Sequence, residues 1–250
     1  MSDSLRKSIT LLEALRVMAD GGSARTLAEA TGIPRSTVQR LLTVLDESQM
    51  VVQDSRTLKY SIGPKTLMLG MAYRRGIDLS SLARPLMLQL RASTNETVGL
   101  SIRIGNVRMF IEEVQSLAHL RFASELGALY PLWSGAAGRV LMTELSEVEI
   151  DAVLGSTPDA AAIVHAPIGR DELLRLMRHV RLTKNARAFN ETLDNISSIA
   201  VPVRDNRGAV AASLSLSGPS ERLTDARMDE VLPLLNDAAE QLANGLGANS

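Results

Sequence analysis

The chain has 250 residues, of which 45% are hydrophobic and 22% are charged, and this composition predicts a globular protein that can bury a core. It contains no cysteine, which excludes disulfide bonds, thiolate zinc sites and a cysteine nucleophile, and is typical of a reducing compartment. No stretch approaches 18 uninterrupted apolar residues and the N-terminus lacks a signal-peptide pattern, so we expect a cytoplasmic protein with no membrane partner.

The net charge of −1 conceals an asymmetry along the chain. Residues 1–75 contain 11 Lys and Arg against 7 Asp and Glu, a net charge of +4, whereas residues 76–250 contain 16 against 21, a net charge of −5. A basic module gains affinity for nucleic acid because its cations displace counterions condensed on the phosphates. The asymmetry favours an N-terminal module that binds nucleic acid, although a chance scatter of four charges would give the same sums.

Apolar residues at helical spacing predict a three-helix unit at the N-terminus. The predicted inward residues of the first helix are Leu5, Ile9, Leu12, Leu15 and Met18. Gly21-Gly22 ends this helix, a short second helix covers 24–30, and the turn at 31–33 leads to a third helix that begins at Pro34. The predicted inward residues of the third helix are Val38, Leu41, Leu42 and Leu45.

A β-hairpin, or wing, is predicted after the third helix. Its strands cover 50–53 and 58–62, and the second shows alternating apolar residues after a polar turn. A linker helix then covers 65–75 and carries Leu67, Met68 and Met71. The predicted domains are therefore 1–64 for a winged helix-turn-helix, 65–76 for the linker helix and 77–250 for a second domain.

The second domain mixes strands and helices, which makes the whole chain α+β. A helix over 79–92 precedes residues 97–114, where apolar residues alternate around Gly105-Asn106 and predict an antiparallel hairpin with one buried face. Further helices are predicted over 136–145, 171–181 and 225–246, and further strands over 197–203 and 209–216. We expect Pro202 at a sheet edge or bulge, because proline has no N–H to donate to a neighbouring strand.

The exposed face of the third helix carries side chains suited to DNA. A three-helix unit with a glycine turn before its third helix, followed by a hairpin, can place that helix in the major groove. Arginine pairs with guanine and glutamine with adenine, so Arg35, Gln39 and Arg40 are candidate base contacts. The candidate phosphate contacts are Ser36 and Thr37 near the helix start and Arg56 and Lys59 on the wing.

Four runs of this sequence resemble the IclR (isocitrate lyase regulator) family of bacterial regulators. They are LAEATGIPRSTVQRLLTVLDESQMV, KYSIGPKTLMLG, YPLWSGAAGRVLM and FNETLDNISSIAVPVRDNRGAVAASLSLSGP. The resemblance implies a winged helix-turn-helix that binds a double-stranded DNA operator, a linker helix that helps dimerisation, and a GAF-like effector-binding domain. It also implies a homodimer or a homotetramer built as a dimer of dimers, with repression as the more frequent role.

The resemblance further implies an effector site between the Pro-Leu segment and the last strands. Its residues here are Trp133, Ser134, Gly135, Ala136, Asn190, Glu191, Ser215 and Ser217. Glycine and alanine at a helix start expose N–H groups that favour an anion, and serines at alternate strand positions share one face, so we expect a small organic or aromatic acid. The alternative is that these small residues only permit tight helix packing.

Two residues depart from the family pattern, since Trp133 lies where His is frequent and Arg139 lies where Lys is usual. The tryptophan changes the polarity expected there, and a lone tryptophan packs in a core more often than it forms a ligand platform. Arg108 and Arg121 are weaker candidates for a counter-charge to the acid, because arginine is usually exposed.

Motifs of catalysis are missing: the sequence has no G-x-S-x-G, no phosphate-binding loop and no H-E-x-x-H. Its histidines, His119, His165 and His179, are scattered, and Glu112 and Glu113 are more typical of a solvent-facing pair than of metal ligands. We therefore expect no enzymatic activity, metal or cofactor. A ligand-independent architectural DNA-binding protein is the alternative, and an enzyme carrying a DNA-binding domain is a weaker one.

Overall fold

The computed structural model describes residues 3–76, 78–124, 126–156 and 168–248. The chain divides into two compact units, Met1–Gly76 and Ile77–Ser250. Among the helices in these described ranges, none combines the length and apolar character needed to cross a lipid bilayer.

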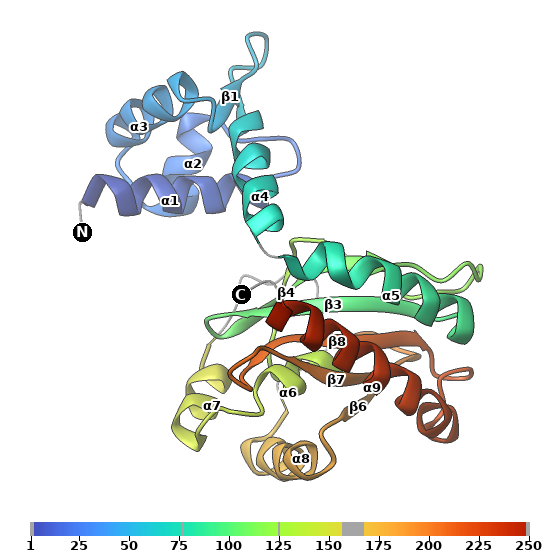
Figure 1. Cartoon of the computed structure of the whole chain (residues 1–250). Helices are drawn as coiled ribbons and strands as arrows, with labels where there is room; N and C mark the ends of the chain where they lie inside the picture. Colours follow the sequence, from blue (N-terminus) through green and yellow to red (C-terminus); the bar gives the residue numbers. More distant parts are fainter. Residues whose placement is uncertain (1–2, 77, 125, 157–167, 249–250) are drawn as a thin grey trace. The chain divides into compact units, whose positions relative to one another are not determined.

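The first unit contains three helices of a helix-turn-helix, a wing and a further helix (Figure 1). Its elements are α1 (Asp3–Arg16), α2 (Ala24–Thr31), α3 (Arg35–Glu47), β1 (Val51–Gln53), β2 (Tyr60–Ile62) and α4 (Pro64–Gly76). Strands β1 and β2 pair antiparallel, and Gly22 pairs with Tyr60 as an isolated bridge on the other side of β2. The predicted winged helix-turn-helix is confirmed.

The predicted inward face of α1 is partly wrong. Leu5 and Ile9 are exposed by 54% and 50%, whereas Leu11 and Leu15 are buried. The buried residues lie in the second half of α1, where this helix packs against α2 and α3. The first two turns of α1 contribute no residue to a buried cluster among the described residues, so the apolar spacing there does not indicate a core-facing side.

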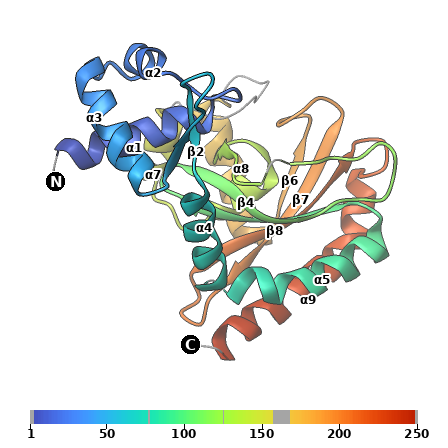
Figure 2. The ribbon, with the colours of Figure 1, turned by 90° about the horizontal axis from the view of Figure 1, so that it is seen from above.

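The second unit is an antiparallel sheet with helices on both faces (Figures 1 and 2). Its strands are β3 (Thr97–Ile104), β4 (Val107–Val114), β5 (Leu129–Pro131), β6 (Ala186–Phe189), β7 (Ile196–Arg204) and β8 (Val210–Pro219), in the order β5-β4-β3-β8-β7-β6. Its helices are α5 (Asp78–Thr94), α6 (Gly135–Leu141), α7 (Glu147–Leu154), α8 (Arg170–Thr183) and α9 (Asp225–Ala248). The predicted α+β class is confirmed.

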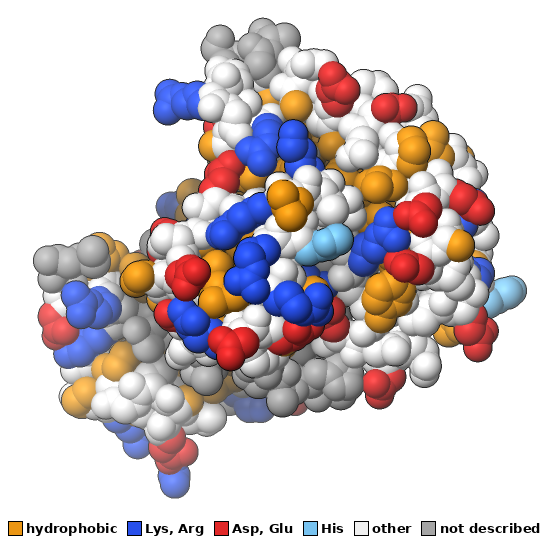
Figure 3. Space-filling model, turned by 90° about the horizontal axis from the view of Figure 1, so that it is seen from below, with side chains coloured by type: hydrophobic (Ala, Val, Ile, Leu, Met, Phe, Trp, Pro, Cys, Tyr) orange, Lys and Arg blue, Asp and Glu red, His pale blue; other side chains and the backbone are white. Residues whose placement is uncertain are grey.

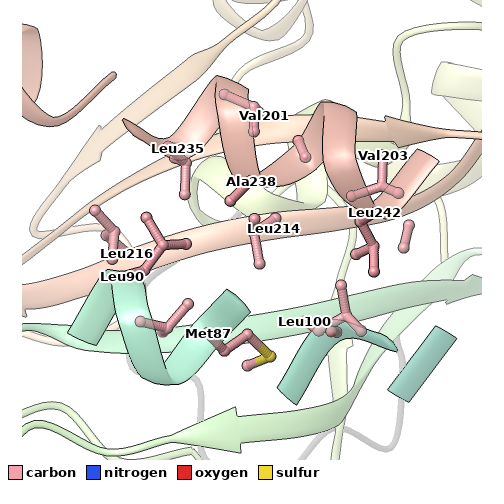
Figure 4. Packing of buried hydrophobic residues seen from close by; sticks show 14 of the residues in the cluster. Met87, Leu90, Leu100, Val201, Val203, Leu214, Leu216, Leu235, Ala238 and Leu242 are labelled. Carbon is pink, nitrogen blue, oxygen red and sulfur yellow. The ribbon is translucent and has the colours of Figure 1, made fainter. Parts of the chain in front are cut away.

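One face of this sheet is covered by α5 and α9, which lie side by side (Figure 2). Leu100, Val201, Leu214 and Leu216 point from the strands toward these helices and form an apolar cluster with residues such as Leu235 (Figure 4). Burial of this many aliphatic side chains is the main favourable contribution to the stability of the unit.

The predicted antiparallel hairpin is confirmed, but the expectation that only one of its faces is buried is wrong, because the other face of the sheet is also buried. The residues that alternate with the apolar ones along these strands point to this second face, and they are buried as well. They are Gly99 and Ser101 on β3 and Arg108 and Phe110 on β4. Helix α6 packs on this second face, against β6, β7 and β8. The residues on this face are small or polar, which leaves room for α6, and the same residue types would be expected on a strand face exposed to solvent.

The structure refines several predicted elements. Helix α6 ends at Leu141 rather than at 145, and sequence analysis missed the short strands β5 and β6. It also missed α7, which begins with a capping box in which the Ser146 hydroxyl and the Glu149 carboxylate accept hydrogen bonds from each other's backbone N–H groups. Pro202 lies beyond the last pairing of β7 with β6, which is the edge environment expected for proline.

Candidate nucleic-acid interface and buried cavity

Helix α3 is positioned by a capped helix and a glycine turn. The Ser23 hydroxyl accepts a hydrogen bond from the backbone N–H of Thr26 at 3.1 Å and caps the start of α2. Gly32 ends α2 with a φ of 70°, a conformation that glycine adopts without strain, and its N–H donates to the carbonyl of Ala28. The buried residues of α3 are Val38, Leu41, Leu42 and Leu45. Its opposite face is therefore turned to solvent.

The candidate base and phosphate contacts of α3 lie on this outer face. Arg35, Ser36, Gln39 and Arg40 are exposed, and Thr37 is half-buried. The Gln39 side chain has a partner that sequence analysis missed, since its Nε2 donates to the hydroxyl of Tyr60 at 3.1 Å. Tyr60 is buried on β2. This hydrogen bond holds the Gln39 amide beside the wing.

The wing turn is ordered by one carboxylate. Asp54 accepts hydrogen bonds from the backbone N–H of Thr57 at 2.7 Å and of Arg56 at 2.9 Å. These hydrogen bonds, together with one from the Thr57 hydroxyl, favour the charged form and hold the pKa of Asp54 below its ordinary value. Arg56 and Lys59 are exposed on this turn.

Ion pairing separates two groups of cations in the first unit. Lys7, Arg16 and Arg25 each pair with an acidic residue of their own helix at 2.6–3.0 Å. In contrast, the cations on α3 and the wing form no ion pair with any residue that the structure describes; they are Arg35, Arg40, Arg56 and Lys59. Cations without an internal partner are available to neutralise phosphates or to bond base edges.

In the second unit, a row of serines lies beneath α6. Ser213, Ser215 and Ser217 on β8 are buried and, as predicted from their spacing, share one face. The strand register places Ser101 opposite Ser213 and Ser198 opposite Ser217. A Cβ at Gly138 of α6 would overlap the carbonyl oxygen of Leu132, so this glycine permits close packing of α6.

A small inner cavity of about 20 Å³ lies between α6 and this polar face. Its lining residues are Arg108, Phe110, Phe122, Ala136, Ala137, Ala188, Glu191, Thr192, Ile196, Ser198, Ser215 and Ser217. Four of the predicted effector residues are among them: Ala136, Glu191, Ser215 and Ser217. The Ser215 hydroxyl donates to the carbonyl of Gly99 at 3.2 Å, which fixes its orientation.

Glu191 lines the inner cavity, and both of its carboxylate oxygens are bonded by Arg139, a bidentate pair that we call the Glu191 fork. Arg139 Nη1 and Nη2 donate to the two carboxylate oxygens of Glu191 at 2.5 and 2.9 Å, and Nη2 also donates to the carbonyl of Arg187 at 2.5 Å. Arg139 is only 1% exposed. The backbone N–H of Gly135 donates to Glu191 at 3.2 Å. The N–H group expected to be free for a ligand is thus already bonded to a carboxylate of the chain.

Arg108 lines this cavity and is buried, whereas sequence analysis gave exposure as the usual environment of arginine. It is 3% exposed, and its Nε and Nη1 have no hydrogen-bond partner in the part of the chain that the structure describes. Its guanidinium lies 4.9 Å from the ring centre of Phe110 and 4.8 Å from that of Tyr130. Burial lowers the pKa of Arg108 to about 10, so the side chain remains charged at neutral pH.

A larger outer pocket of about 560 Å³ lies on the other side of Glu191. Its lining residues are Trp133, Arg139, Ile168, Glu172, Arg175, Leu176, His179, Val180, Arg187, Phe189, Asn190 and Glu191. Figure 3 shows the side of the molecule on which α8 lies, with Lys and Arg side chains beside hydrophobic ones and a histidine. Two of the pocket's arginines pair with acidic residues outside the Glu191 fork, Arg175 with Glu172 and Arg187 with Asp225 and Asp229.

The remaining predicted residues take several environments. Trp133 is buried in an apolar cluster and also lines the outer pocket, so it packs in a core and borders a cavity at once. Asn190 is exposed at the outer pocket, and Ser134 is fully buried with its hydroxyl 3.4 Å from that of Thr192. Arg121 is exposed, as expected.

The adjacent acids on β4 do not behave as a solvent-facing pair. Glu112 is only 4% exposed and pairs with Arg84 of α5 at 2.7 Å, which corrects the prediction for this residue. Glu113 is half-buried and bonds Ser124. The described His, Asp and Glu side chains contain no group of three that could hold a metal ion, and His165 lies outside the described residues.

The first unit is a winged helix-turn-helix, and the second is an antiparallel α+β unit with an inner cavity, an arrangement found in DNA-binding regulators. Residues 4–55 match the model of the IclR helix-turn-helix domain, and residues 71–244 match that of the bacterial transcriptional regulator IclR C-terminal domain. The chain therefore belongs to the IclR family of bacterial transcriptional regulators.

Individual relatives agree with this assignment. The HTH-type transcriptional repressor AllR of Escherichia coli K12 is 29% identical over 246 residues, covering 98% of this chain and 91% of the relative. The AllR of Salmonella paratyphi A is 30% identical over 250 residues, covering 98% and 90%.

Two crystal structures share the fold. An IclR transcriptional regulator from Alicyclobacillus acidocaldarius has a TM-score of 0.82 at 22% identity, covering 99% of this chain and all of the other. An IclR homologue from Microbacterium hydrocarbonoxydans, complexed with 4-hydroxybenzoate, has a TM-score of 0.80 at 19% identity, covering 98% and 99%.

Proposed function

We propose that this protein is a cytoplasmic transcriptional repressor whose binding to operator DNA is modulated by a small organic or aromatic acid. The observation that carries the proposal is the outer face of α3, where Arg35 and Arg40 are exposed without an ion-pair partner among the described residues. The curated AllR relatives are named transcriptional repressors, which supports the sign of regulation.

In this proposal α3 enters the major groove and contacts base edges, while the wing lies over the adjacent backbone. Arg35 and Arg40 bond guanine, and Gln39 exchanges its bond to Tyr60 for one to adenine. Ser36, Thr37, Arg56 and Lys59 contact phosphates. The chain self-associates as a dimer or dimer of dimers, which places two copies of α3 in successive major grooves of a palindromic site.

The effector acts from residues 77–250, through the cavities on the α6 side of the sheet. The homologue complexed with 4-hydroxybenzoate supports an acid as effector. The proposed domains are the winged helix-turn-helix at 1–64, the linker helix at 65–76 and the effector domain. A coupling free energy of about 1–3 kcal/mol between effector and operator, transmitted through the linker helix, is enough to change the affinity for the operator about five- to 150-fold.

A gel-shift titration of the purified full chain on DNA upstream of its own gene tests this function. The titration is done at two salt concentrations, with unrelated DNA as competitor. We expect specific, salt-sensitive retardation that candidate acids weaken or strengthen. Retardation equal to that of unrelated DNA at both salt concentrations would argue against an operator in that region, and retardation that no acid alters would favour the architectural alternative.

A further inference from the structure

The wing turn holds a leucine in a backbone conformation that leucine disfavours. Leu58 has a φ of 58°, in the left-handed region that glycine and, less readily, asparagine adopt. The non-glycine residues of the described chain with a positive φ are Gln49, Leu58, Asn95, Lys184, Asn190 and Asn195. Leu58 is the one apolar residue among them. Glycine or asparagine would therefore fit this position of the turn with less backbone strain.

Hydrogen bonds of the wing impose this conformation on Leu58. Its N–H donates to the carbonyl of Asp54 at 2.8 Å, and its carbonyl accepts from Nε2 of Gln53 at 3.1 Å. Beside it, the N–H of Asp54 donates to the carbonyl of Lys59 at 2.9 Å. Disfavoured conformations persist only where the surrounding structure imposes them, and they concentrate at functional sites. The direction in which the Leu58 side chain leaves the backbone is therefore fixed.

Packing within the described chain does not explain an apolar side chain at this position. Figure 1 shows the wing turn as a loop that projects from the paired strands β1 and β2. Leu58 is 62% exposed and belongs to no buried cluster among the described residues. A single exposed leucine is common on protein surfaces. This one, however, stabilises the fold neither by burial nor by its backbone conformation, so its contact is to be sought outside the folded chain.

The neighbours of Leu58 indicate which partner it contacts. Arg56 and Lys59 lie on the same turn, are exposed and form no ion pair with any residue that the structure describes. Such cations are attracted to DNA, and most strongly to a narrow minor groove, where the negative potential is enhanced. A hydrocarbon side chain gains nothing from phosphates, but it can bury apolar surface against the deoxyribose rings and base edges of the groove. Charge selects DNA as the partner, and the leucine selects the interior of the groove.

We propose that Leu58 enters the minor groove next to the major groove that α3 occupies, and packs there against deoxyribose rings and base edges. The inference rests on the proposed function and adds to it a contact that discriminates in the minor groove. In that groove guanine carries an exocyclic amino group, which obstructs a hydrocarbon side chain and would lose its hydrogen bonds to water. Leu58 therefore favours A·T over G·C pairs beneath the wing.

Leu58→Gly tests the proposal, because a leucine that serves the fold and a leucine that serves DNA predict opposite changes in stability. Glycine relieves the left-handed backbone, so urea unfolding of the full chain should show a more stable first unit, with an unfolding equilibrium constant lowered about fivefold. Gel-shift titration on DNA upstream of the gene and on unrelated A·T-rich DNA should show affinity reduced about fivefold on both. Leu58→Met, which keeps an apolar side chain, should bind as the wild type does.

Gln49→Gly is the matched control for the backbone. Gln49 has a φ of 59°, is exposed and lies in the same unit, but its side chain is polar and lies outside the wing turn. This variant should gain stability as Leu58→Gly does and keep the DNA affinity of the wild type. Leu58→Asn excludes greater flexibility of the wing as the cause, because asparagine tolerates the same conformation and should show the same loss of affinity.

A chemical change confined to the minor groove tests the contact itself. Replacing adenine by 2,6-diaminopurine adds an amino group in the minor groove and leaves the major-groove edge unchanged. We expect this DNA to weaken binding of the wild type and of Leu58→Met more than binding of Leu58→Gly. The proposal is overturned if diaminopurine affects the wild type and Leu58→Gly equally, if Leu58→Gly and Leu58→Asn bind DNA as the wild type does, or if both are less stable than the wild type.

The same titrations separate this inference from the proposed function. If the wild type binds upstream and unrelated DNA equally, and the loss in Leu58→Gly depends on diaminopurine, the minor-groove contact holds and the proposed operator recognition fails. If upstream DNA is bound specifically, and with the same affinity by the wild type, Leu58→Gly and Leu58→Asn, the proposed function holds and the inference fails. If the wild type retards no DNA, both fail.

Discussion

Arg108 and Arg139 are buried to nearly the same degree, at 3% and 1% exposure, but their surroundings differ. Arg139 donates to both carboxylate oxygens of Glu191 and to a backbone carbonyl. Arg108 lies over two aromatic rings and leaves two nitrogens without a hydrogen-bond partner among the described residues. Burial alone therefore does not say how the charge of an arginine is compensated; the groups that face its guanidinium do.

Mutations at these two sites should change the stability of the protein in opposite directions. Removing the partner of a paired buried charge leaves an uncompensated charge behind, whereas replacing an unpaired buried charge by an apolar side chain removes a cost. The first change should destabilise this protein and the second should stabilise it. This contrast leads to the two largest expected effects.

Glu191→Leu should give the largest loss of stability. The variant leaves Arg139 buried without a carboxylate, and loss of one partner from a buried pair costs about 3–5 kcal/mol; we expect the lower end because Glu191 is 29% exposed. The free energy of unfolding in urea measures this effect. Glu172→Leu, which breaks the exposed pair with Arg175, is the control and should leave stability unchanged. Equal stability of both variants would show that the Glu191 fork is not structural.

Arg108→Met should instead raise the stability of the ligand-free protein by about 1–4 kcal/mol, because methionine fills similar volume without a buried charge. The gain should depend on pH. The folded pKa of about 10 lies below the ordinary value of arginine, so the folded state disfavours the protonated side chain. This cost is complete below pH 10 and decreases as the pH rises through 10.

Urea unfolding of the wild type and of Arg108→Met, at pH 7 and at about pH 11, measures this dependence. The difference in the free energy of unfolding between the two proteins should be larger at pH 7. A variant that is less stable than the wild type at pH 7 would mean that the guanidinium has a structural partner, and the contrast between Arg108 and Arg139 would be lost.

The exposed face of α3 could be predicted from the sequence, but the different environments of the buried Arg108 and Arg139 could not. The outer face of α3 follows from local periodicity, since Val38 and Leu42 determine which side of the helix is buried. The environment of Arg108 depends on α6, which arrives from another part of the chain and covers the second face of the sheet. Gly99 and Ser101, which make room for it, gave β3 the alternating pattern of a half-exposed strand.

The same reasoning explains the other differences. Leu5 and Ile9 have the spacing of a buried face, but none of the described elements covers the first turns of α1. The burial of Glu112 was missed because its ion-pair partner, Arg84, is 28 residues away in α5 and could not be paired with it from the sequence. Effects set by the local chain could be predicted, whereas partners distant in sequence could not.

The same comparison between paired and unpaired arginines can be made in the first unit. Arg40, like Arg108, has no ion pair within the described chain, whereas Arg16, like Arg139, has one. Arg40→Ala should weaken specific operator binding by about 1–3 kcal/mol if Arg40 bonds a guanine, and binding to unrelated DNA should change little. Arg16→Ala should leave both affinities unchanged. Gel-shift titrations on operator and unrelated DNA measure the ratio, and equal losses on both would make Arg40 a phosphate contact.

Lys59→Ala should have the smallest effect on DNA affinity, and this effect is best measured through its dependence on salt concentration. Lys59 lies exposed on the wing turn that Asp54 orders, and we propose that its ammonium neutralises one phosphate rather than bonding a base. The variant should lose affinity a few-fold on every DNA sequence and reduce the slope of log affinity against log salt by about 1. A loss confined to the operator with an unchanged slope would place Lys59 among the base contacts, because only a charge released from a phosphate contributes to that slope.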